Sequence, residues 1–80
     1  MTVRKATRYL IAIEGDRSRN YAAYSPDVPG GVAAGETPEE CKREMREALA
    51  VHLEGLALAG APIPRPRSSA ACVDVAAPAV

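Results

Sequence analysis

The sequence predicts an α+β fold: a small two-layer sandwich in which one long helix covers a three-stranded antiparallel sheet and a final short strand follows (β-β-β-α-β). Three observations support this fold class. Short alternating apolar stretches lie between turn residues before residue 36, a helix-start signal stands at Thr37, and a proline-rich linker leads to another apolar stretch after residue 66. The length of 80 residues predicts a single domain, 1–80, with an ordered core at about 7–76.

The first three strands are predicted from residues that alternate between two faces. Tyr9, Ile11 and Ile13 fall on one face of a strand that spans residues 7–14. A polar turn at 15–20 leads to a second strand at 21–25, and a short apolar stretch at 31–35 predicts the third. This alternation is typical of an antiparallel sheet that is covered on one side only.

Between the second and third strands the chain is expected to turn at Pro26, Pro29 and Gly30. Each proline lacks the amide proton that a central strand needs and has a fixed φ angle. The glycine can adopt a positive φ angle, which lets the chain reverse. We therefore assign these three residues a structural role in the turn.

The helix is predicted from Pro38 to about Ala59. Thr37 can cap its first turn, Pro38 suits the first helical position, and Glu40 completes a capping box with Thr37. The apolar stripe recurs at three- and four-residue spacing and consists of Cys41, Met45, Ala48, Leu49, His52, Leu53 and Leu56. The charged residues between them predict a solvated opposite side.

Beyond the helix, Gly60 is a suitable C-terminal stop and Pro62 cannot continue the helix. The linker at 62–66 is expected to be extended and to return the chain along the helix, so that residues 70–75 form the last strand of the sheet. The second face of the sheet would then lack a helix and would need solvent or a subunit to cover it.

Composition argues against several functional classes. Ten basic and ten acidic residues give zero net charge, whereas dedicated nucleic-acid binders usually show a basic excess. No apolar run approaches the roughly 20 residues of a membrane span. Domains of roughly 70–80 residues or fewer usually need a disulfide, a metal or a partner subunit, and the first two are not expected here. The chain is therefore predicted to form a homo-oligomer, a dimer or a tetramer.

The residues that could carry chemistry are sparse and scattered. Cys41 and Cys72 have no paired spacing and no signal peptide precedes them, so both are expected to be free thiols in the cytoplasm. His52 is the only histidine, and the sequence has no Cys-x-x-Cys or His-x-x-x-His pair that could begin a metal site. We predict no catalytic residues, no metal site and no cofactor, and hence a protein that is not an enzyme.

Four segments in this order resemble the HicB-like antitoxin family of toxin–antitoxin systems. They are the turn at 24–30, the helix start at 35–40, the helix end at 53–56 and the linker at 62–66. The likeness spans roughly residues 9–75. It implies a partial RNase H-like fold without the acidic active site, and a partner of the HicA type, a small double-stranded-RNA-binding-like toxin that cleaves messenger RNA. Family members bind the toxin, cover its active-site histidine and oligomerise.

Two departures from the family pattern are visible. Many members continue into a helix-turn-helix or ribbon-helix-helix domain, whereas this chain stops soon after the last predicted strand, which argues against direct DNA binding. Gly31 stands where relatives often have cysteine, and that change is expected to affect packing.

The leading hypothesis is that the chain neutralises a toxin ribonuclease by direct binding, with Tyr21, Tyr24 and Asp27 as candidate contacts. Partial burial in the sheet is an equally good interpretation of the two tyrosines. An orphan oligomeric regulatory or scaffold protein without a toxin is the alternative. A third hypothesis, an active nuclease remnant, would depend on Glu14 or Asp27 and on magnesium.

Overall fold

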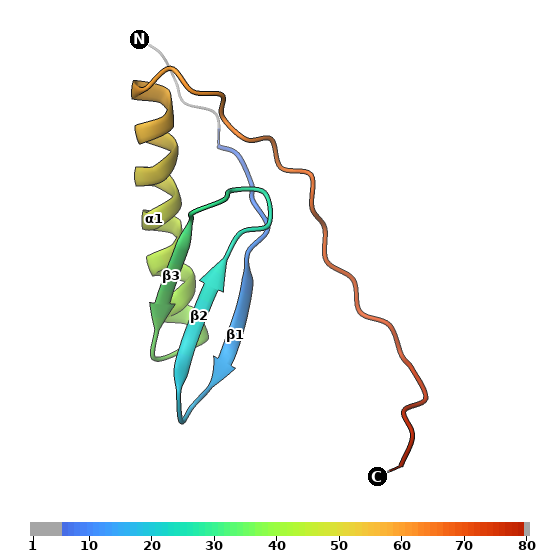
Figure 1. Ribbon diagram of the computed structural model, residues 1–80. Coiled ribbons are helices and arrows are strands. Elements are labelled where there is room, and N and C mark those ends of the chain that lie inside the picture. The colour runs from blue at the N-terminus through green and yellow to red at the C-terminus, as the bar shows by residue number, and fades with distance from the viewer. Residues whose placement is uncertain (1–5, 80) are drawn as a thin grey trace.

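The computed structural model describes residues 6–79 and shows a three-stranded sheet with a helix packed across one face (Figure 1). The strands are β1 (Ala12–Asp16), β2 (Asn20–Tyr24) and β3 (Val32–Gly35), and the helix is α1 (Pro38–Leu58). This confirms the predicted α+β class and the order β-β-β-α. Among the described residues, no helix is both long and apolar enough to cross a membrane.

The sheet has the order β1-β2-β3 and both pairings are antiparallel. Ala12 lies opposite Tyr24, which in turn lies opposite Val32, so three residues form one row across the sheet. β1 and β2 are joined by a tight turn at 17–19, in which the Arg19 amide donates to the Asp16 carbonyl at 3.2 Å. The turn is therefore shorter than the predicted 15–20, because both strands extend into that range.

The start of β1 also differs from the prediction. Tyr9 and Ile11 lie before the strand, in an extended segment that has no ladder partner within the described chain. The segment is nevertheless fixed, because the buried Ser25 hydroxyl donates to the Leu10 carbonyl at 2.8 Å. The side chains of Tyr9 and Ile11 pack against the core, as the alternation predicted.

The helix begins where the sequence placed it. The Thr37 hydroxyl accepts a hydrogen bond from the Glu40 amide at 3.0 Å, and Glu39 and Glu40 lie in the first turn, close to the positive end of the helix dipole. At the other end, Gly60 has a φ of +71°, a left-handed conformation that glycine adopts easily. The helix thus crosses the full length of the sheet.

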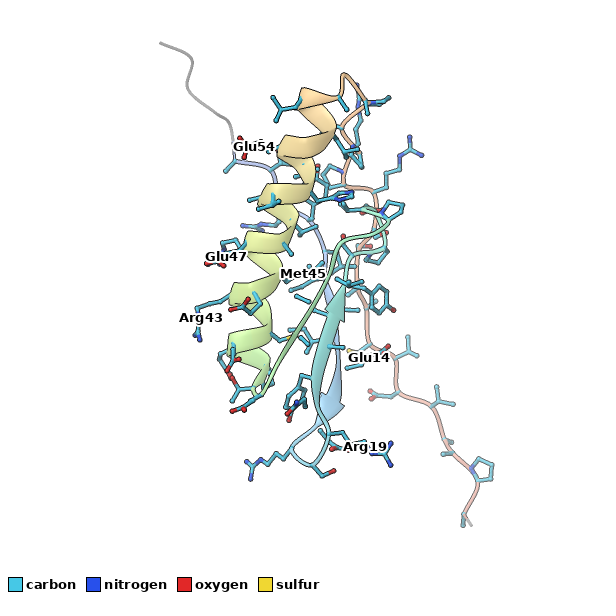
Figure 2. All side chains as sticks on the ribbon, turned by 60° about the vertical axis from the view of Figure 1, so that its left-hand side comes forward. Glu14, Arg19, Arg43, Met45, Glu47 and Glu54 are labelled. Carbon is cyan, nitrogen blue, oxygen red and sulfur yellow. The ribbon has the colours of Figure 1, made fainter. Side chains whose placement is uncertain are left out.

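The core lies between α1 and the sheet. Its buried hydrophobic side chains are Ala23, Val28, Cys41, Met45 and Leu49. Met45 points from the middle of α1 toward the sheet, whereas Arg43 projects away from it (Figure 2). Five buried hydrophobic residues make a thin core, in keeping with the small size of the domain.

The predicted last strand is not formed. Residues 61–79 are extended, yet they contain no strand, although all of them belong to the described part of the chain. Figure 1 shows this segment leaving the end of α1, passing the β1 side of the sheet and continuing away from the body. An apolar stretch with strand periodicity becomes a strand only when an edge pairs with it, and no edge within residues 6–79 does so here.

Candidate protein-interaction surface

One face of the sheet carries no helix, and we call it the open face. Its side chains alternate with those that face α1 and come from all three strands: Ala12, Glu14, Ala22, Tyr24, Val32 and Ala34. Tyr24 is 44% exposed and Val32 is 66% exposed, and the two lie opposite each other on β2 and β3. Small, flat and mostly apolar, this face can be approached closely by another protein.

The two tyrosines predicted as contacts have different surroundings. Tyr24 lies on the open face. Tyr21 lies on the face toward α1, where it is half-buried and packs against the core. Odd and even positions of one strand face opposite sides of the sheet. Because Tyr21 faces α1, only Tyr24 remains available for contact with another protein.

Asp27, the third predicted contact, already has partners within the chain. Its carboxylate accepts hydrogen bonds from the backbone amides of Ser68 (2.8 Å) and Arg67 (2.9 Å), and from the Ser68 hydroxyl (2.8 Å). These bonds, with the Ser68 amide contributing most, hold the pKa of Asp27 below its usual value. Asp27 therefore ties the turn after β2 to the C-terminal segment.

The turn itself is shaped by its own backbone. The Val28 amide donates to the Ser25 carbonyl (3.3 Å), the Gly31 amide donates to the Val28 carbonyl (3.1 Å), and Gly30 has a φ of +88°. These bonds bury the Val28 side chain under the loop that carries Pro26 and Pro29. The turn thus presents Asp27 to the C-terminal segment while it closes one end of the core.

A groove runs between α1 and the segment that leads into β1; we call it the β1 groove. It measures about 730 Å³, its floor is apolar, and its rim carries the basic side chains of Arg8, Lys42 and Arg46. The residues of the floor are Tyr9, Ile11, Met45, Leu49 and Leu53. Its lining residues come from the segment at 7–11 and from α1, and none comes from β1 itself.

A second groove, the β3 groove, lies between α1 and the opposite edge of the sheet. It is smaller, about 540 Å³, and is lined by β3, Val51 and His52, with Glu44 and Glu47 at its helix side. The charged residues of the helix were predicted to form one solvated side, whereas in the structure they divide between the two grooves. The spacing held the signal, because Lys42 and Arg46 are four residues apart and share one flank, whereas Glu44 and Glu47 are three apart and share the other.

The described residues offer no constellation for metal binding, since nowhere in 6–79 do three His, Cys, Asp or Glu side chains come together. Cys41 is buried against β3 and Cys72 is exposed on the C-terminal segment, and both are free thiols. The candidate functional features are therefore the open face, the two grooves of opposite charge and the extended C-terminal segment.

Comparison with known proteins agrees with this picture. The family model described as HicB_like antitoxin of bacterial toxin-antitoxin system matches residues 9–77, which is most of the chain. No curated protein matches the sequence. The matched range includes the sheet, the helix and nearly all of the extended tail.

Proposed function

Since the chain belongs to the HicB-like antitoxin family, we propose that it is an antitoxin that neutralises a HicA-type, mRNA-cleaving toxin by binding it directly in the cytoplasm. In this proposal the chain contributes a binding surface and no catalysis. The β-β-β-α order is compatible with the partial RNase H-like fold that the family resemblance implies.

The open face is the observation that supports a binding function. It exposes Tyr24 and Val32 on a flat background of alanines, and the described chain places no helix over it. Exposed aromatic side chains surrounded by small residues are typical anchors in protein interfaces. Tyr24 is therefore the residue that we expect to contribute most to toxin binding.

The β3 groove extends this surface. Val32 and Ala34 belong to the open face and also line the β3 groove, so Glu44 and Glu47 lie beside the proposed contact area. A toxin that binds RNA needs a basic surface, because the negative charge of the RNA phosphates must be neutralised. Acidic side chains next to the contact area would attract that surface and steer the encounter.

The test is co-expression with the product of the neighbouring reading frame, followed by pull-down and an mRNA-cleavage assay. We expect the chain to bind that product and to stop its cleavage. A Tyr24→Ala variant should bind at least about tenfold more weakly, as expected for an interface anchor worth more than about 1.4 kcal/mol. Circular dichroism should show an unchanged fold, since Tyr24 faces away from the core.

Leu58→Ala is the matched control, because Leu58 is also a large exposed hydrophobic residue but lies at the far end of α1, where it is 84% exposed. Its toxin binding should equal that of the wild type. If the Tyr24→Ala variant bound the toxin as tightly as the wild type does, the open face would not be part of the toxin interface. If the neighbouring gene product is no ribonuclease and the chain captures none, the antitoxin proposal fails and the orphan alternative takes its place.

A further inference from the structure

We propose that Ser68 is a modification site, at which a protein kinase that selects basic sequences transfers a phosphoryl group to the serine hydroxyl and so releases residues 67–79 from Asp27. The observation that carries the inference is the contact between the Ser68 hydroxyl and the Asp27 carboxylate, at 2.8 Å. The inference concerns the regulation of this chain and does not depend on the existence of a toxin.

Ser68 lies where a single carboxylate holds the C-terminal segment. Its hydroxyl donates to one oxygen of Asp27, and the amides of Ser68 (2.8 Å) and Arg67 (2.9 Å) donate to the other oxygen. Earlier in the segment, the Tyr9 hydroxyl donates to the Pro64 carbonyl at 2.6 Å. Every residue from 69 to 79 is exposed, so we expect the three bonds to Asp27 to fix the path of the chain beyond residue 66.

The sequence around Ser68 has the charge pattern of a kinase substrate. Arg65 and Arg67 are both exposed and stand three positions and one position before Ser68. No acidic residue occurs from 61 to 73. Kinases distinguish their substrates by charge patterns of this kind, because basic side chains beside the serine pair with acidic groups on the enzyme. The segment therefore suits a kinase that selects arginine.

The conformation of the segment suits the same reaction. Residues 61–79 contain no helix or strand, and Figure 1 shows them passing the body of the domain as a single extended chain. Ser68 is half-buried while it is bound to Asp27, so it must leave the carboxylate before an enzyme can reach it. That departure breaks three hydrogen bonds and no secondary structure, which makes it a local opening and leaves the core intact.

The phosphoryl donor in this reaction is a nucleoside triphosphate. The Ser68 oxygen forms a bond to the γ-phosphorus, the bond from that phosphorus to the oxygen bridging the β- and γ-phosphates breaks, and the nucleoside diphosphate leaves. The hydroxyl proton passes to the catalytic base of the kinase and then to water. Ser68 thereby exchanges a neutral hydrogen-bond donor for a group that carries a charge of about −1.5 to −2 at pH 7.

The phosphate group cannot take the place of the hydroxyl beside Asp27. The Asp27 carboxylate is charged at neutral pH, because hydrogen bonds from the Ser68 and Arg67 amides hold its pKa below the usual value. A phosphate on Ser68 would replace a hydrogen bond to this carboxylate with repulsion between two anions. The charge of Arg67, which now favours the Asp27 carboxylate, would be drawn to the phosphate on the next residue. Both changes weaken the two amide bonds as well.

Release would change the surface at one end of the sheet. Asp27 lies in the turn that follows β2, three residues after Tyr24. Once its three donors have left, the carboxylate is free to accept hydrogen bonds from another molecule. The sequence predicted Asp27 as a partner contact, whereas the structure shows it occupied by its own chain. Phosphorylation of Ser68 is the step that would make it available.

The first measurement is phosphoryl transfer from labelled ATP to the full-length chain, by a protein kinase that requires arginine three positions before the serine. Mass spectrometry of the peptides should place the phosphate on Ser68, and Ser68→Ala should lose the label. Arg65→Ala/Arg67→Ala should slow the transfer by at least about tenfold, because each arginine pairs with the kinase. Ser69→Ala is the matched control and should be labelled like the wild type, since Ser69 is the next residue and is exposed.

The second measurement follows the C-terminal segment by NMR in full-length protein with phosphoserine introduced at position 68 or at position 69. Phosphoserine at 68 should raise the hydrogen-exchange rate of the Arg67 amide by at least about tenfold, because the Arg67 bond to Asp27 opens. Phosphoserine at 69 should leave this rate close to that of the wild type. Ser68→Ala should raise the rate much less, because this variant loses the hydroxyl bond but gains no charge.

Each contrary result overturns the proposal. The kinase may transfer no phosphate to the chain, or it may label Ser69 in place of Ser68. Phosphoserine at 68 may leave the Arg67 amide as protected as in the wild type. Equal release by phosphoserine at 69 would show that the position of the charge is irrelevant, and equal release by Ser68→Ala would show that the charge itself is. None of these results bears on whether the open face binds a toxin.

Discussion

The two edges of this sheet are flanked by the same helix, yet they differ in charge and in size. The segment that leads into β1 borders a larger groove with an apolar floor and three basic residues at its rim, whereas the β3 edge borders a smaller groove with two acidic residues. A helix can give its two flanks opposite charge while its buried stripe stays the same. One small domain therefore presents a basic flank and an acidic flank, and the acidic flank lies beside the contact area proposed for a basic toxin.

The largest effect is expected from a change that damages both edges at once. Met45 is fully buried in the middle of α1; it forms part of the floor of the β1 groove and lies near Gly31, next to β3. Met45→Ala should lower the free energy of unfolding by about 2–5 kcal/mol, because it leaves a cavity in a core of only five buried hydrophobic residues. Urea unfolding followed by circular dichroism measures this loss.

The control for Met45 is Leu58→Ala, on the same helix but exposed, where the change should stay within about 0.5 kcal/mol. A domain of this size has a total stability of roughly 4–12 kcal/mol. The Met45 variant should thus be only marginally stable, and its toxin binding should weaken as well. If Met45→Ala and Leu58→Ala unfold at the same urea concentration, the Met45 side chain does not stabilise the packing of α1 against both edges of the sheet.

A change of charge should separate the two edges. Glu44→Lys/Glu47→Lys should slow association with a basic toxin by about tenfold or more, since rim charges act mainly on the association rate. Lys42→Glu/Arg46→Glu, the mirror change on the other flank of α1, should alter that association rate much less. Stopped-flow or biolayer interferometry at several salt concentrations measures the association rate of each double variant, and the effect of changing Glu44 and Glu47 should shrink as salt rises. Equal slowing by both double variants would contradict the assignment of the toxin to the acidic flank.

How far the sequence could predict this structure depends on how local each signal is. The helix start could be predicted because Thr37, Pro38 and Glu40 satisfy a rule that involves only neighbouring residues. The side of the sheet that Tyr9, Ile11 and Ile13 occupy followed from alternation alone. For these elements the information lies within a few residues of chain.

The long-range features could not be predicted in the same way. Nothing near Asp27 in the sequence indicates that its carboxylate binds the amides of residues forty positions later. Residues 70–75 have the periodicity of a strand, but pairing depends on which edge is free and in reach, and periodicity carries no information about that. The final strand was therefore predicted where the structure has an extended segment that contains no strand. That Tyr24 is available to a partner, whereas Asp27 is already hydrogen-bonded within the chain, became clear only from the fold.

The smallest expected effect concerns the hydrogen bonds that anchor the C-terminal segment to Asp27. Hydrogen bonds from Ser68 and Arg67 lower the pKa of Asp27 below its ordinary value of 3.8, so the charged carboxylate stabilises the anchored segment at any pH above that value. This contribution is lost as the pH falls through the lowered pKa, and the anchor should open only in acid, below about pH 4. In NMR spectra of the labelled protein, the amide signals of Arg67 and Ser68 should move in that range, and in Asp27→Asn they should already be shifted at neutral pH.

Asp16 is a matched internal control, because its pKa is lowered in the same direction by Ser18 within the β1–β2 turn. Asp16→Asn should move the Ser18 amide and leave the C-terminal segment in place, since the hydrogen bonds of Asp16 span two residues whereas those of Asp27 span forty. If Asp27→Asn leaves the Arg67 and Ser68 amides unmoved, Asp27 does not hold the C-terminal segment, and the path of that segment is set by Tyr9 and the prolines alone.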